Sequence, residues 1–213
     1  MTAQQKIDNA AANGQTRLDL INLNLTSLPT ISHLTSLQEL HLALNKLQTL
    51  PTLPPYLRKL YISGNNLQTL PTLPPTLQML SASTNNLQTL PVLPHTLQKL
   101  DVSCNKLQTL PVLPPALWQL KIPCNHLQTL PDLSHLTELR YIDIFSNPIT
   151  HSHINNSNHP LLKDKLTFNQ RDIGAFNTAV SLFTNKNTYF GLLPRDITGI
   201  ITEYINYIPV TVI

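Results

Sequence analysis

The sequence predicts an α/β solenoid, in which short coils stack side by side and share one parallel β-sheet. Three observations predict it. A 20-residue unit recurs through the middle of the chain, each unit carries a short apolar alternation at the period of a strand, and a proline-rich stretch follows each alternation. Leucine supplies 41 of the 213 residues, whereas charged residues make up only 12%. A chain of this length and composition can bury a sizeable core.

The repeated unit is nearly invariant within the chain. Four segments read L-x-x-L-x-[IAV]-x-x-N-x-L-Q-T-L-P-x-L, and they begin at Leu57, Leu77, Leu97 and Leu117. The unit that begins at Leu37 has the same core. One further unit lies on each side at a spacing of 22 residues, and these outer units carry Leu18 and Ile142. The chain therefore contains seven predicted coils.

Each coil is predicted to contain a strand, a turn and an extended return. The L-x-L core alternates apolar and polar residues, which is the pattern of a strand with one buried face. The stretch L-Q-T-L-P-x-L-P-P contains too many prolines for a helix and is typical of polyproline II backbone. An asparagine follows every strand except the first, at Asn45, Asn65, Asn85, Asn105, Asn125 and Asn147. Because an amide both donates and accepts, we expect these side chains to form a buried ladder.

Both ends of the solenoid need a cover, because a terminal coil has no neighbour over its leucines. Residues 1–16 predict an N-terminal capping helix over roughly Ala3 to Ala12, with Ile7 and Ala11 on one face. Residues 17–150 contain the seven repeats.

Residues 151–213 differ in composition from the repeats, since four of the five phenylalanines lie there and only six leucines. A capping box near Thr167 and a proline at Pro194 predict the starts of two amphipathic helices. These helices either cover the last coil or dock a partner.

The repeats resemble the leucine-rich-repeat family, specifically its short LPX subclass in effector proteins of intracellular bacterial pathogens. The resemblance covers about Leu18 to Ile149 and rests on five nearly identical L-x-x-L-x-[LIAV]-x-x-N-x-L-Q-T-L-P units. It implies a right-handed horseshoe whose concave sheet binds proteins. It also implies a protein that a bacterium secretes into the host cell and that acts in the cytosol.

The outward strand positions vary from coil to coil, whereas Gln-Thr recurs after the post-ladder leucine in all five central units. Positions that are the same in every unit are expected to stabilise the coil, so the outward positions that vary between units are the candidates for partner binding. The candidate partner-binding residues are His41, Lys59, Tyr61, Met79, Ser81, Lys99, Asp101, Trp118, Gln119, Lys121, Arg140, Tyr141, Asp143 and Phe145. Aromatic residues flanked by charges are typical of interface anchors and their rims.

We expect Trp118, Tyr141 and Phe145 to form the binding hot spot. Two alternatives remain open from the sequence. Trp118 could instead cover the edge of the sheet, and Phe145 could instead pack against the C-terminal segment.

Two further groups of residues could carry chemistry. Cys104 and Cys124 occupy the same place in successive units and should stack, but two thiols fall short of a four-ligand zinc site. We expect them to be small residues that fill a turn. His151, His153 and His159 lie in a polar stretch with no acidic or thiol ligand at useful spacing, so we expect a solvated loop. No metal and no cofactor is predicted.

The leading functional hypothesis is a monomeric, non-catalytic protein that binds a host protein or a fellow bacterial effector on the concave face. In a sharper form, it inhibits an enzyme by covering the mouth of the active site. The net charge of +3 is too small to indicate nucleic acid or a membrane as partner. The sequence shows no catalytic nucleophile paired with a general base, no phosphate-binding loop and no metal cluster, so nothing in it indicates an enzyme.

The alternative hypothesis is a ubiquitin-ligase adaptor. The stretch from Leu193 to Ile205 is similar to the opening helix of an F-box, a module that links proteins to ubiquitin ligases. Some effectors of the LPX subclass carry a catalytic cysteine domain after the repeats. No cysteine follows Cys124 here, so that ligase activity is not expected.

Overall fold

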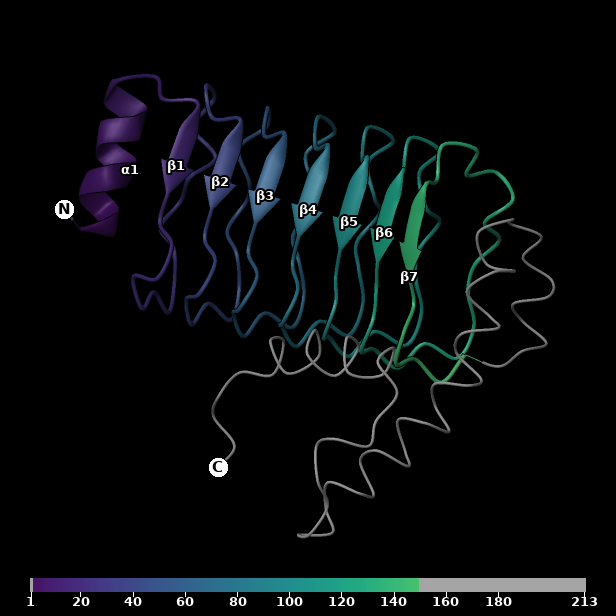
Figure 1. The fold of residues 1–213 in the computed structure, drawn as a ribbon. Coiled ribbons are helices and arrows are strands. Elements are labelled where there is room, and N and C mark those ends of the chain that lie inside the picture. The colour runs from purple at the N-terminus through teal and green to yellow at the C-terminus, as the bar shows by residue number, and fades with distance from the viewer. Residues whose placement is uncertain (1, 150–213) are drawn as a thin grey trace, which may run out of the picture. The chain divides into compact units, whose positions relative to one another are not determined.

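The computed structural model describes residues 2–149. This part of the chain consists of one helix followed by seven strands (Figure 1). The elements are α1 (Ala3–Ala12), β1 (Arg17–Asp19), β2 (Glu39–His41), β3 (Lys59–Tyr61), β4 (Met79–Ser81), β5 (Lys99–Asp101), β6 (Gln119–Lys121) and β7 (Tyr141–Asp143). The helices predicted after residue 150, the F-box-like stretch and the three clustered histidines lie outside the described residues.

The seven strands form one parallel sheet in the order β1 to β7, as Figure 1 shows. Their register follows the repeat, because Leu40 pairs with Leu60 and Leu60 with Leu80. The two longer terminal units keep this register, since Leu18 pairs with Leu40 and Leu120 with Ile142. The sequence therefore predicted the solenoid, its strand count and its register correctly.

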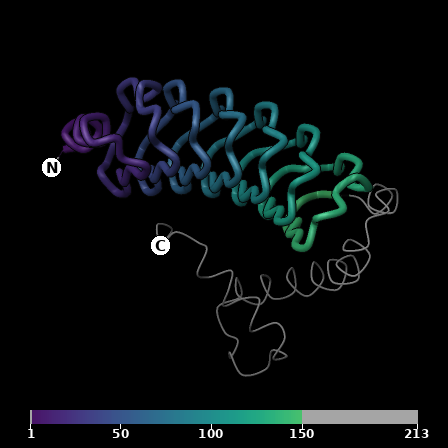
Figure 2. Tube along the Cα trace, turned by 90° about the horizontal axis from the view of Figure 1, so that it is seen from above, coloured from purple at the N-terminus to yellow at the C-terminus, as the bar shows by residue number. Residues whose placement is uncertain are grey.

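Leucines from every side of each coil fill the interior. In the third coil, Leu57 lies before the strand, Leu60 lies within it and Leu67 lies after it. All three are fully buried. The return path is extended, and α1 is the only α-helix between residues 2 and 149. Seen from above in Figure 2, successive coils follow one another from α1 onward. The core is therefore a set of leucine rows that run through the stack.

The asparagines form the predicted ladder. Asn65 accepts a hydrogen bond from the backbone N–H of Leu47 at 3.0 Å. Its Nδ2 donates to the carbonyls of Leu42 and Ile62, each at 3.0 Å. One amide thus satisfies backbone groups of its own coil and of the preceding coil. Equivalent bonds are made by Asn45, Asn85, Asn105, Asn125 and Asn147.

Helix α1 has the predicted bounds and covers the first coil. A capping box begins it, in which Thr2 Oγ1 accepts from the backbone N–H of Gln5 and Gln5 Oε1 accepts from that of Thr2. Ile7 and Ala10 are the buried residues, so the prediction of Ala11 was one position wrong. The Ala10 carbonyl accepts a hydrogen bond from the backbone N–H of Gln15 at 3.0 Å as the chain turns towards β1.

The residue before each ladder asparagine lies in the left-handed region of backbone conformation. The φ values are +57° at Leu44, +68° at Gly64, +53° at Thr84, +52° at Cys104, +53° at Cys124 and +52° at Ser146. Only glycine adopts this region without a Cβ penalty. Five of the six coils that have a ladder asparagine therefore carry a side chain in an unfavourable backbone conformation at this turn.

Candidate functional site

The concave face consists of the outward residues of β1 to β7 and the residues that directly flank these strands. In β2 to β6 the central residue is buried and both of its neighbours are partly exposed. The register aligns one row through Lys59, Met79, Lys99, Gln119 and Tyr141 and a second through Tyr61, Ser81, Asp101, Lys121 and Asp143. The structure thus brings the predicted strand residues together on one face, in the predicted rows.

The N-terminal half of this face contains a compact charged cluster. Lys59 Nζ donates a hydrogen bond to Glu39 Oε1, from the adjacent strand. This bond lowers the pKa of Glu39 below its ordinary value and raises the pKa of Lys59 above its own. His41 Nε2 lies 3.6 Å from Glu39 Oε2, and its ring stacks on Tyr61 with centroids 4.4 Å apart. These four side chains are engaged mainly with one another.

The middle of the concave face, at β4, has smaller outward side chains and fewer charges than the two halves. Met79 and Ser81 are the outward residues of β4. The Ser81 hydroxyl lies 3.0 Å from that of Ser63, which is within hydrogen-bond distance. No charged side chain projects from β4, so this strand separates the charged cluster at β2 and β3 from the C-terminal half.

The C-terminal half joins cations to aromatic rings. Lys99 Nζ lies 4.5 Å from the centroid of a Trp118 ring. Lys121 Nζ lies 5.7 Å from the centroid of the Tyr141 ring. Both distances are those of cation–π contacts, and in each the lysine and the ring come from successive coils. Gln119 lies between Lys99 and Tyr141 in their row.

The three predicted anchor residues all reach the surface. Tyr141 is 40% exposed, while Trp118 and Phe145 are half-buried. Trp118 directly precedes β6, an interior strand of the sheet, and its ring lies against Lys99, an outward residue of β5. The alternative packing of Phe145 on the C-terminal segment involves residues outside the described range.

Sequence reasoning missed a local role of the aspartates. Asp19, Asp101 and Asp143 each accept a hydrogen bond from the backbone N–H two residues later, at 3.1 to 3.2 Å. Asp101 also accepts from the hydroxyl of Ser103 at 2.6 Å. These bonds are Asx turns, which fix the chain as it leaves the strand. An aspartate as the last residue of a strand was the available signal.

Cys104 and Cys124 are not joined by a disulfide and are both partly buried. They come from the left-handed turn of adjacent coils, and the Cys104 N–H donates to the carbonyl of Pro123, directly before Cys124. A hydrogen bond with Cys124, together with burial, raises the pKa of the Cys104 thiol far above its ordinary value. At neutral pH this thiol is therefore protonated and a poor nucleophile.

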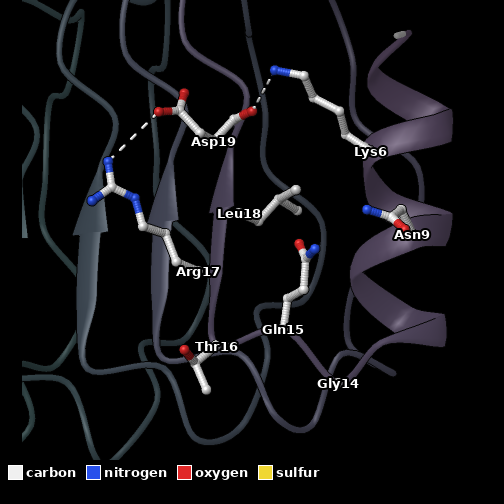
Figure 3. A pocket seen from close by; sticks show the side chains of 8 residues that line it. All are labelled: Lys6, Asn9, Gly14, Gln15, Thr16, Arg17, Leu18 and Asp19. Carbon is white, nitrogen blue, oxygen red and sulfur yellow. Dashed lines mark hydrogen bonds and ion pairs between the residues drawn. The ribbon is translucent and has the colours of Figure 1, made fainter.

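One shallow hollow of about 690 Å³ lies between α1 and β1 (Figure 3), and nothing in the sequence analysis predicted it. Lys6 Nζ donates to the Asp19 carbonyl at 3.0 Å across it, and Arg17 lies 3.7 Å from the Asp19 carboxylate. Its charged groups are therefore paired locally. Between residues 2 and 149 there is no cluster of three or more metal-ligating side chains, and no helix has the length and apolarity to cross a membrane.

Known proteins share this architecture. The Leucine Rich Repeat family profile matches residues 56–78 and 96–120. A Shigella effector leucine-rich-repeat domain of known structure is 32% identical, with a TM-score of 0.61, and the match covers 72% of this chain and 79% of that one.

Two structures of YopM are also similar. YopM from Yersinia enterocolitica is 37% identical over 68% of this chain, with a TM-score of 0.65. YopM from Yersinia pestis, described as a leucine-rich effector protein, is 36% identical over 69%, with a TM-score of 0.64. The matches span only 32% and 42% of those two chains. No curated protein sequence matches significantly. The chain therefore belongs to the leucine-rich-repeat family and resembles the leucine-rich-repeat domains of bacterial effectors.

Proposed function

We propose that the protein is a non-catalytic bacterial effector that holds one protein partner on its concave face. The observation that carries the proposal is that certain buried positions of the repeat are constant, whereas outward strand positions vary. In the five central units the ladder asparagine and the leucine at the centre of the strand repeat unchanged, whereas the aligned outward rows differ in charge, size and aromaticity from coil to coil. A scaffold alone does not require that variation.

The size of the face suits a protein partner. Seven parallel strands about 4.8 Å apart make a sheet roughly 30 Å across. A standard protein interface buries about 800 Å² on each partner, so one side of a small domain can cover this face. A small-molecule site would instead need an enclosed pocket.

Trp118, Tyr141 and Phe145 serve as the anchors in this proposal. Large amphipathic rings bury much area with few rotatable bonds, and Trp and Tyr dominate binding hot spots. Lys99 and Lys121 restrain two of these rings before a partner arrives, which lowers the entropy lost on binding. The charged cluster around Glu39 forms part of the polar rim.

The proposal extends to the setting in which the protein works. Its relatives include effectors of Yersinia and Shigella, which supports secretion by a bacterium and action in the host cytosol. The proposal takes the protein to act there as a monomer. The partner is a host protein or a fellow effector. If that partner is an enzyme, a rigid curved sheet can inhibit it by covering the mouth of its active site.

A capture experiment tests the proposal. Purified wild-type protein and a Trp118→Ala/Tyr141→Ala variant are each immobilised and incubated with host lysate and with bacterial lysate, and bound proteins are identified by mass spectrometry. We expect a specific protein that the wild type retains and the variant loses. Equal recovery by both proteins would contradict the proposed site.

A matched control removes apolar side chains from another part of the surface. Tyr56 is 59% exposed and Val92 is 87% exposed, and both precede their strands on the return path. A Tyr56→Ala/Val92→Ala variant should bind like the wild type. Thermal melts of all three proteins must show the same folded state, so that lost binding reports on the face and not on unfolding.

A further inference from the structure

The left-handed turn after each strand carries cysteine in two adjacent coils, those of β5 and β6. In the other coils with a ladder asparagine the same position holds Leu44, Gly64, Thr84 and Ser146. A cysteine suits this backbone no better than leucine, threonine or serine, because glycine and asparagine are the residues that tolerate it. The conformation of the turn therefore does not explain why two successive coils place a thiol there.

The backbone holds Cys104 and Cys124 side by side. Their φ values are +52° and +53°, so the two residues leave equivalent turns in a similar conformation. The Cys104 N–H donates to the carbonyl of Pro123 at 2.8 Å, and the N–H of Asn105 donates to the carbonyl of Cys124 at 3.1 Å. These bonds continue the pairing of β5 with β6 beyond the strands, which lie side by side in Figure 1. The two side chains are also in contact, since the Cys104 thiol forms a hydrogen bond with Cys124.

The spacing of the two turns suits a disulfide. Paired parallel chains lie about 4.8 Å apart, and the Cα atoms of a disulfide are usually about 4.4–6.8 Å apart. The Cβ atoms need to approach to about 3.5–4.5 Å, a movement of under about 1 Å from the strand spacing. Both cysteines are partly exposed, so an oxidant or a reductant in solution reaches them. An accessible disulfide that needs this adjustment is readily formed and readily reduced.

We propose that Cys104 and Cys124 form a site of reversible oxidation, at which a small disulfide such as glutathione disulfide converts the two thiols into a disulfide within the chain. This inference goes beyond the proposed function and does not depend on a protein partner. The bond ties the turn after β5 to the turn after β6. It lies beside the predicted anchor Phe145, whose carbonyl accepts from the Cys124 N–H at 2.9 Å.

The hydrogen bond between the two side chains decides which thiol attacks first. This bond, together with burial and the negative charge of an ionised Cys124, raises the pKa of the Cys104 thiol, so the proton stays on Cys104. Cys124 is therefore the thiol that loses its proton and attacks one sulfur of glutathione disulfide. A bond forms between Cys124 Sγ and one glutathione, the disulfide of the reagent breaks, and the departing glutathione thiolate takes up the proton that Cys124 released.

The first step also prepares the second. In the mixed disulfide Cys124 carries no negative charge and its sulfur accepts a hydrogen bond less well, so the pKa of Cys104 falls. The Cys104 thiolate attacks Cys124 Sγ, and the second glutathione leaves with the proton that Cys104 released. In total the two protein thiols lose two electrons, and one glutathione disulfide is reduced to two glutathione thiols.

Trypsin digestion tests the site directly, because cleavage after Lys106 and Lys121 places the two cysteines in different peptides. The reduced full-length protein, at low micromolar concentration and neutral pH, is incubated with about 1 mM glutathione disulfide, alkylated, and digested without reductant. We expect an intact mass lower by two hydrogen atoms and a disulfide that joins peptide 100–106 to peptide 122–140. Excess reduced glutathione should restore the original mass and separate the two peptides.

Two variants test the order of attack and the spacing. Cys104→Ser removes the second attacking thiol, so it should accumulate the mixed disulfide of Cys124 with glutathione. Thr84→Cys/Cys104→Ser is the matched control, because it keeps two thiols in the same turn but two coils apart. At about 9.6 Å this pair exceeds the limit of roughly 7 Å between the Cα atoms of a disulfide, so it should form no bond within the chain. Thermal melts establish that both variants are folded.

Several outcomes would overturn the inference. They are an unchanged mass, a stable mixed disulfide on the wild type, a bond between two molecules in place of one within the chain, and equal cross-linking of the control variant. A Cys104→Ser variant that stays unmodified would contradict Cys124 as the attacking thiol. A bond that excess reduced glutathione fails to open would be a permanent cross-link, contrary to a reversible site. The capture experiment reports on the concave face separately, so the failure of one proposal is distinguishable from the failure of the other.

Discussion

The side-chain oxygen of Asn85 accepts a hydrogen bond at 3.1 Å from the backbone N–H of Leu67, 18 residues earlier. The nitrogen of the same amide donates to the carbonyls of Ile62 at 3.0 Å and Ala82 at 3.2 Å. The side chain therefore joins the fourth coil to the third through backbone groups that have left the sheet. Because Asn85 is only 8% exposed, water is poorly placed to substitute for it.

Replacing Asn85 by Ala should destabilise the fold by about 2–4 kcal/mol. The substitution leaves one N–H and the carbonyls it served without their partner, and each buried unpaired group costs about 1–3 kcal/mol. The free energy of unfolding in urea measures this loss. Asn85→Asp should also destabilise, because a carboxylate keeps the acceptor but cannot donate to the carbonyls.

Asn66→Ala is the matched control. Asn66 is exposed and lies one position after the ladder asparagine of the preceding coil. Its substitution should change the free energy of unfolding by no more than about 0.5 kcal/mol. If Asn85→Ala were as mild as Asn66→Ala, the ladder would not be what holds the coils in register.

Most of the fold was predictable, because each coil buries the same types of residue at the same positions of the repeat. The spacing of the leucines set the strand triplets and the register, and the recurring asparagine identified the ladder. The N-terminal end, where α1 packs on the first coil, was harder to predict. Whether Ala10 or Ala11 is buried depends on the angle at which α1 packs, and the linear pattern does not define that angle.

The candidate site was predictable in position but not in contacts. The period of the repeat placed Lys99 and Lys121 on one face correctly. It did not predict that each lies over a ring of the next coil, because that depends on side-chain conformation between residues about 20 positions apart. The left-handed turn was also missed, since only Gly64 among the six equivalent residues indicates it.

The left-handed turn predicts opposite effects in two adjacent coils. Gly64→Ala should destabilise by about 1–2 kcal/mol, the usual penalty for a Cβ in this region. The added Cβ would also lie 3.0 Å from Leu44 Cδ2, although that methyl can move. Thr84 has a β-branched side chain at the same turn, with φ of +53°. Thr84→Asn should stabilise by about 0.5–1 kcal/mol, because Asn tolerates this conformation better.

Urea unfolding of both variants beside the wild type checks this pair of effects. Thr89 is exposed and lies outside the turn, so Thr89→Asn controls for the change of residue type and should be nearly neutral. Stabilisation by Gly64→Ala, or destabilisation by Thr84→Asn, would show that the backbone penalty does not govern this position.

The Asx turn at β5 predicts that Asp101 contributes to stability. Asp101→Ala removes bonds to the N–H and the hydroxyl of Ser103 and should cost about 1–2 kcal/mol. Asp101→Asn keeps an acceptor for the backbone N–H and should recover about half of that loss. Ser103→Ala removes only the hydroxyl bond and should therefore fall between the wild type and Asp101→Ala. Chemical denaturation of the three variants gives the order, and a neutral Asp101→Ala would refute the structural role.

The pair formed by Glu39 and Lys59 predicts a pH dependence of stability. The hydrogen bond from Lys59 holds the pKa of Glu39 below its ordinary value in the folded state. The folded state therefore binds a proton less readily than the unfolded state, so the pair contributes stability above the unfolded pKa of about 4.3. That contribution is lost as the pH falls through the lowered pKa of folded Glu39. Lys59→Met should accordingly melt at a lower temperature than the wild type at pH 7, and the difference should shrink as the solution is made more acidic.

The carboxyl resonance of Glu39 measures the pKa of this residue directly, apart from the pH dependence of stability that follows from it. In a ¹³C NMR titration, the pKa of Glu39 should rise in Lys59→Met, because its hydrogen-bond donor is gone. Lys46→Met removes an exposed lysine after the strand and should leave both the Glu39 titration and its pH profile unchanged. His41, which lies 3.6 Å from Glu39, is kept in all of these proteins, so they differ only at the substituted lysine. An unchanged Glu39 pKa in Lys59→Met would mean that the two side chains are separated by water in solution, and the N-terminal half of the concave face would then offer a free carboxylate and a free ammonium to a partner.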